Sequence, residues 1–69
     1  MSSNYRNDII LALQLKLEGE IAAHQVNIKI MLGSHAGIAE HPDMIGTIEE
    51  TLEKLATAQD KLSNLSQFK

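Results

Sequence analysis

The fold of this chain is decided by residues 9–32, IILALQLKLEGEIAAHQVNIKIML, which carry apolar residues at helical spacing on two separate sides. From Tyr5 to Leu32 the chain has no proline and a single interior glycine, Gly19. We therefore expect one helix over about residues 4–32, roughly 42 Å long at about 1.5 Å per residue.

The apolar side chains of this helix separate into two stripes when each residue turns by about 100°. The first stripe consists of Ile10, Leu13, Leu17, Ile21, Ile28 and Met31, with His24 in line with them. The second consists of Leu11, Leu15, Ala22, Val26 and Ile30, with Gly19 near its middle. Two apolar sides separated by polar residues are typical of a helix packed between two neighbours.

A second helix is expected over about residues 42–67, after a turn formed by residues 33–41. Gly33 suits the position just after a helix, because glycine readily adopts the left-handed conformation found there. Pro42 suits the first position of the next helix, where its fixed φ is favourable and its missing N–H is not needed.

The second helix is apolar on one side and charged on the other. Its charged side includes Glu50 and Lys54, which are spaced for an ion pair four residues apart. Its apolar side can cover only one stripe of the first helix. The pattern leaves open which stripe this is. We assign the first stripe to the hairpin core, together with Ile45, Ile48, Leu52, Leu55 and Leu62, because the small residues and Gly19 at the second stripe favour a close contact between subunits.

These patterns predict an all-α, single-domain chain (residues 1–69) that folds as a two-helix antiparallel hairpin and dimerises into a four-helix bundle. A chain of 69 residues buries little apolar surface by itself, and it has no cysteine to form a stabilising disulfide. The uncovered stripe is a larger apolar patch than monomers usually expose. We expect a homodimer or a higher even-numbered oligomer, with an interface formed by Leu11, Leu15, Ala22, Val26 and Ile30.

The charge and hydropathy of the chain exclude several classes of partner. Nine acidic residues outnumber six scattered basic ones, which argues against binding to a nucleic-acid backbone. The richest apolar run is interrupted by Gln14 and Lys16, and the N-terminal residues lack the pattern of a signal peptide. The first helix also lacks the lysine-rich polar face of a membrane-surface helix. We expect a cytoplasmic protein with no nucleic-acid or membrane partner.

Residues that carry chemistry are few in this sequence. His35 and His41 share the turn with Glu40 and are the candidates for a metal site, but they lack the tight ligand spacing of familiar zinc sites. We expect turn residues there, and no metal or cofactor. There is no phosphate-binding glycine motif and no nucleophile with a neighbouring base, so we expect no enzyme. His24 is interpreted as a satisfied interface histidine.

A resemblance covers about the C-terminal half of the chain. The segments GIAEHPD (37–43), IEETLEKL (48–55) and DKL (60–62) are similar to small helical-hairpin proteins of T4-like marine phages. This resemblance implies a two-helix fold and carries over no site.

Two functional hypotheses follow from the residues. The first is a small homo-oligomeric helical interaction or structural module that can also contact another protein. The second is a small ligand- or metal-binding bundle that uses the histidines of the turn.

Overall fold

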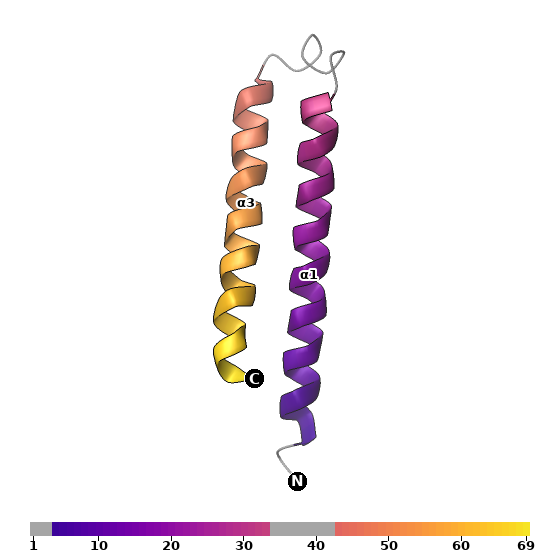
Figure 1. Cartoon of the computed structure of the whole chain (residues 1–69), viewed down its shortest axis with the longest axis vertical. Coiled ribbons are helices and arrows are strands. Elements are labelled where there is room, and N and C mark those ends of the chain that lie inside the picture. The colour runs from indigo at the N-terminus through magenta and orange to yellow at the C-terminus, as the bar shows by residue number, and fades with distance from the viewer. Residues whose placement is uncertain (1–3, 34–42) are drawn as a thin grey trace.

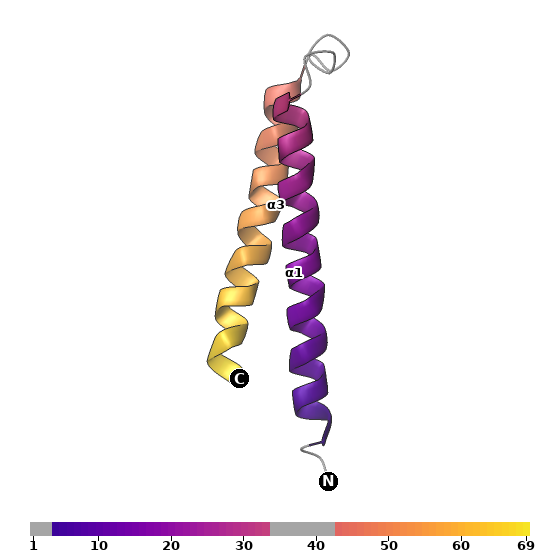
Figure 2. The ribbon, with the colours of Figure 1, turned by 45° about the vertical axis from the view of Figure 1, so that its right-hand side comes forward.

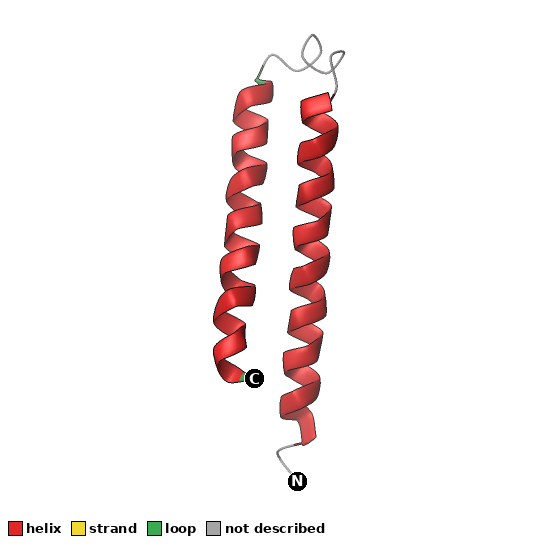
Figure 3. Ribbon diagram, viewed as in Figure 1, coloured by secondary structure: helices red, strands yellow, loops and turns green. Residues whose placement is uncertain are grey.

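The computed structural model describes residues 4–33 and 43–69 and shows two long helices side by side (Figures 1 and 3). Helix α1 spans Asn4–Gly33 and helix α3 spans Met44–Leu65, followed by the 3-10 helix η1 at Ser66–Phe68. The helices run in opposite directions, and the described ranges contain no strand. The chain is thus an all-helical hairpin, and its Cα atoms extend over 58 × 15 × 13 Å.

The two helices pack along seams in which the steps alternate between four and three residues. This is the spacing of a coiled coil, in which the same side of each helix returns to its neighbour every seven residues. All members of both seams are buried or half-buried. In α1 they are Ile10, Gln14, Leu17, Ile21, His24, Ile28 and Met31, and in α3 they are Met44, Ile48, Thr51, Leu55, Ala58, Leu62 and Leu65.

Three residues assigned to the hairpin core from the sequence lie outside these seams. Leu13 is 43% exposed, Leu52 is 49% exposed and Ile45 is 85% exposed. Each lies one residue from a seam position and is therefore turned away by about 100°. Gln14 and Thr51 occupy seam positions instead of the larger Leu13 and Leu52, because the four-three spacing decides which residues meet the other helix.

Burial in this hairpin is shallow. Among the described residues only Leu17 and Ala58 are buried, one in each helix. The other aliphatic seam members are only half-buried, which is what two helices without a third layer can achieve.

The N-terminal part of α1 and the end of α3 are joined by a hydrogen bond. The guanidinium of Arg6 donates to the backbone carbonyl of Phe68 in η1. A positive charge at this place also complements the negative end of the α3 dipole. Beyond this contact α1 extends past the end of α3, as both views show (Figures 1 and 2), and Tyr5 is exposed.

The helix ends differ in detail from those expected. Gly33 is the last residue of α1, and no glycine among the described residues has a positive φ, so the expected left-handed conformation is not adopted. Helix α3 begins at Met44 and not at Pro42, because Asp43 has a non-helical ψ of 42° and forms the N-cap. It ends at Leu65, and the chain then tightens into η1.

Gly46 makes room for the N-cap residue. A Cβ atom at Gly46 would lie 2.6 Å from both carboxylate oxygens of Asp43, so this carboxylate sits over the first turn of α3. A negative charge there is favoured by the helix dipole. Thr47 continues the helix, since its backbone N–H and its hydroxyl both donate to the Asp43 carbonyl at 3.1 Å.

We predict that Gly46→Ala changes the free energy of unfolding very little. Alanine raises helix propensity by up to about 1 kcal/mol, but displacing the Asp43 carboxylate from the helix end removes about 0.3–1 kcal/mol. In an Asp43→Ala background this opposing loss is absent, so the same glycine substitution should stabilise the hairpin. Urea unfolding followed by circular dichroism measures the four variants. Equal effects of Gly46→Ala in both backgrounds would contradict the contact.

Candidate functional site

The most prominent exposed feature of the hairpin is the side of α1 that faces away from α3. We call it the outer face, and all its members are exposed, the aliphatic ones between 52% and 62%. Leu15 illustrates its direction, because it lies two residues, or about 200°, from the buried Leu17. The outer face comprises the five residues assigned to the oligomer interface, together with one glycine: Leu11, Leu15, Gly19, Ala22, Val26 and Ile30.

Polar side chains border the outer face on both sides and bond within α1. On one border Gln14 donates to the Glu18 carboxylate at 3.2 Å, and on the other Lys16 donates to the Glu20 carboxylate at 2.5 Å. Both pairs join residues four apart. These polar pairs lie on either side of the outer face, whose own members carry no polar side chain.

Gly19 lies in the middle of the outer face and has no role in the hairpin itself. A Cβ atom added there would meet nothing within 4 Å, and the glycine has no positive φ. Neither packing against α3 nor backbone conformation therefore calls for a glycine. In the interior of a helix it costs about 1 kcal/mol relative to alanine.

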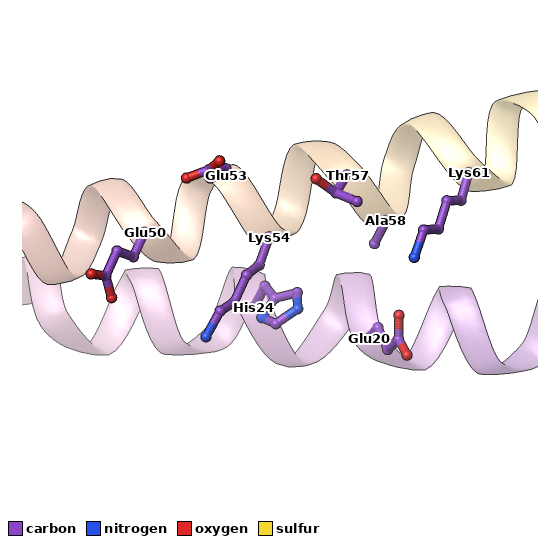
Figure 4. Close-up of a pocket in the computed structure, with 8 residues that line it drawn as sticks. All are labelled: Glu20, His24, Glu50, Glu53, Lys54, Thr57, Ala58 and Lys61. Carbon is purple, nitrogen blue, oxygen red and sulfur yellow. The ribbon is translucent and has the colours of Figure 1, made fainter.

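A shallow groove of about 480 Å³ lies between the two helices on another side of the molecule (Figure 4). In Figure 4, Lys54 and Lys61 reach from α3 toward α1, where Lys54 lies beside His24 and Lys61 lies near Glu20. Three glutamates and two lysines line the groove, so it presents no field of a single sign. Its lining residues are Glu20, His24, Glu50, Glu53, Lys54, Thr57, Ala58 and Lys61.

This arrangement corrects one expectation about charged residues. Among the described residues the ion pair within 4 Å is Lys16–Glu20, and the expected pair of Glu50 with Lys54 does not form. Lys54 instead extends toward α1, along the groove that His24 also lines (Figure 4). Glu50, Lys54 and Lys61 are nevertheless exposed, as residues on the charged side of α3.

His24 occupies a seam position on the α3 side of α1. It is half-buried and lines the charged groove, so it lies away from the outer face. An association of two copies through the outer face would not bring their His24 side chains together.

A second groove, of about 420 Å³ and mostly apolar, lies near the C-terminal end of α3. Leu13, Leu17, Leu65 and Phe68 are among the residues that line it. This groove explains the place of Leu13, which is displaced from the seam onto the groove wall. In the sequence, the signal for this groove was the spacing of four residues between Leu13 and Leu17 and of three residues between Leu65 and Phe68.

The candidate metal ligands His35 and His41, and the neighbouring Glu40, lie outside the residues that the structure describes. Within residues 4–33 and 43–69, no three His, Cys, Asp or Glu side chains are grouped so that they could hold a metal ion. Neither of the two helices of the hairpin is apolar over enough of its length to cross a bilayer.

In comparisons with known proteins, no protein-family model, no curated protein and no solved structure matches this chain. The resemblance to helical-hairpin proteins of marine phages therefore stays a prediction.

The Lys16–Glu20 pair perturbs one ionisable group. The Lys16 ammonium holds the pKa of Glu20 below its usual value of 4.5, first by its hydrogen bond and then by its charge. The positive charges of Lys61 and His24 act in the same direction. Because this pKa is lower in the folded than in the unfolded chain, the pair stabilises the fold fully above pH 4.5, and this contribution is lost as the pH falls through the folded-state pKa.

We predict that the Glu20 carboxyl titrates with a midpoint below 4.5 and that Lys16→Gln moves this midpoint upward. Side-chain carboxyl shifts followed by NMR during an acid titration measure it. Lys29→Gln is the matched control, because it removes a lysine from the same helix far from Glu20. An unchanged midpoint in Lys16→Gln would show that the pair does not persist in solution.

Proposed function

We propose that this protein is a small helical interaction module that associates with a second copy of itself through the outer face of α1. The observation that carries the proposal is the exposure of four large aliphatic side chains, Leu11, Leu15, Val26 and Ile30, along one side of a regular helix. Soluble monomers seldom leave such a strip uncovered, and strips of this kind mark interaction sites.

The amount of exposed surface supports the same proposal. The chain exposes 5404 Å², whereas a compact monomer of 7.6 kDa exposes about 4,300 Å². The surplus of about 1,100 Å² exceeds the roughly 800 Å² that each partner contributes to a standard interface. Its radius of gyration, 16.4 Å, is also well above the roughly 11 Å of a compact domain of this length. Association of two hairpins removes such a surplus.

The chemistry of the outer face favours a protein partner over a nucleic acid or an anionic membrane surface. Its members are aliphatic residues, alanine and glycine, and the nearby Lys16 is already paired with Glu20. A nucleic-acid backbone or an anionic membrane surface is held by clustered free cations, and a protein surface of matching shape is held by apolar contact.

We further propose that the module acts by binding and not by catalysis. Its charged groove is open to solvent and its lysines and carboxylates are exposed or half-buried, so none of them is isolated from water in the way that acid–base chemistry requires. Contact with another protein, in addition to self-association, would use the surfaces that the second copy leaves uncovered.

Sedimentation equilibrium tests the proposal on the unmodified chain and on Leu15→Lys. We expect the chain to form a concentration-dependent dimer or a higher even-numbered oligomer. Burying a leucine side chain contributes about 1.5–3 kcal/mol, and each dimer would lose two of them, so Leu15→Lys should raise the dissociation constant at least about tenfold.

Gln25→Lys is the matched control, because it places the same charge on the polar border of α1 and should leave the assembly intact. Leu17→Ala tests the other side of the helix and should lower thermal stability, since Leu17 is buried against α3. A wild-type chain that remains both helical and monomeric above micromolar concentration would overturn the proposal.

A further inference from the structure

The outer face repeats along α1 with a different period from the seam that meets α3. From Leu11 its members follow one another at steps of four, four, three, four and four residues, ending at Ile30. Steps of four, four and three form an 11-residue repeat of about 3.67 residues per turn, close to the 3.6 of a straight helix. Ile30 is turned by about 100° around the helix axis from Leu11, so the six members form one stripe about 29 Å long and about 100° wide, which a second helix can follow.

The outer face also has the same size pattern from either end. Two large residues, Leu11 and Leu15, are followed by the small Gly19 and Ala22, and then by two large residues, Val26 and Ile30. The spacing is symmetric about the same point, midway between Gly19 and Ala22.

Resting on the proposed self-association, we propose that two copies pack α1 against α1 in antiparallel orientation, with the two-fold axis passing between Gly19 and Ala22. In this register Leu11 faces Ile30 of the second copy, Leu15 faces Val26, and Gly19 faces Ala22. The small residues meet at the centre and the large ones meet on both sides of it.

The symmetry of the pattern favours the antiparallel orientation. In a parallel pair every residue faces its own copy, so the order of residues along the face is unconstrained. In an antiparallel pair the first half of the face must fit the second half, in size and in spacing. The outer face meets both conditions over all six positions, from Leu11 to Ile30.

The place of Gly19 is explained by this arrangement. Within the hairpin nothing occupies the space beside it, and its backbone conformation suits any residue. A helix that crosses at the two-fold axis would use that space, because the absence of a side chain lets the two backbones come close.

The position of the outer face also decides the order of the four helices. Residues that point to α3 and residues of the outer face lie about 200° apart where they are two positions apart, as Val26 and Ile28 do. Polar borders occupy the two sides between them. The two copies of α1 thus lie in the centre of a row, with one α3 at each end, and the polar borders of α1 face water above and below the row.

Cysteine cross-linking tests the register, because the chain has no cysteine of its own. Leu15→Cys and Val26→Cys are purified separately, mixed under reducing conditions, and then oxidised mildly. The proposed register brings these two positions together, whereas two Leu15→Cys chains hold their sulfurs about 16 Å apart along the axis. The variants differ in mass, so intact mass spectrometry separates the mixed dimer from both self-dimers. We expect the mixed dimer to dominate.

A mixture of Leu15→Cys with Gln25→Cys is the matched control, since Gln25 is adjacent to Val26 but lies on the polar border, and it should give little mixed dimer. Leu11→Cys with Ile30→Cys repeats the test if the first pair fails to associate. Predominant Leu15–Leu15 cross-links would show a parallel pair, and an oligomer without either cross-link would show another interface. Either result would contradict the register but not self-association. A monomeric wild-type chain would contradict both proposals.

We predict that Gly19→Leu raises the dissociation constant of the dimer at least about tenfold, because its side chain would overfill the closest contact between the two helices. The isolated hairpin has free space there and should keep its helicity. Gln25→Leu adds the same side chain on the polar border and should leave the dissociation constant unchanged. Sedimentation and circular dichroism measure the two effects, and a dimer that tolerates Gly19→Leu would contradict the central position of this residue.

Discussion

The hairpin depends on apolar burial along a single seam, where side chains spaced by four and three residues in α1 meet side chains with the same spacing in α3. Because two helices form only one layer of contact, most seam members remain half-buried, and Leu17 and Ala58 are the two that are buried. Directional contacts around the seam are few and lie at its ends or on the surface, such as the Arg6 hydrogen bond to Phe68. Because this seam covers only one side of α1, the outer face of that helix remains exposed.

Much of the fold could be predicted from the sequence, because a long proline-free segment with helical spacing has few alternatives. The two helices, their approximate limits and the two-sided character of α1 belong to this part. The assignment of single residues to the seam was harder. Leu52 was assigned to the seam in place of Thr51, and Ile45 in place of Met44, because Ile45, Ile48, Leu52 and Leu55 are also separated by alternating steps of three and four residues. The structure takes the register that contains Met44 and Thr51, so the smaller Thr51 is half-buried and Leu52 is 49% exposed.

The candidate site also has one part that the sequence predicted and one part that it did not. Periodicity alone separated the outer face from the seam, and all five of its predicted residues are uncovered by α3. Contacts that depend on side-chain direction were not predictable, since Lys54 could pair along its own helix with Glu50 or turn across to α1. In the structure, Lys54 extends across to α1 (Figure 4). Sequence spacing shows which pairs are within reach, and only the position of the neighbouring helix decides between them.

The two apolar sides of α1 place opposite demands on its shape. A seven-residue repeat falls short of whole turns by about 20°, so the seam with α3 favours a left-handed winding of the two helices. An 11-residue repeat exceeds whole turns by a similar amount, so the outer face favours a right-handed winding with whatever covers it. A helix that serves both sides cannot follow either winding fully. The proposed pair of α1 helices would therefore be a straight centre, with the α3 helices winding around it from outside, and the small residues Gly19 and Ala22 lie where two straight helices come closest.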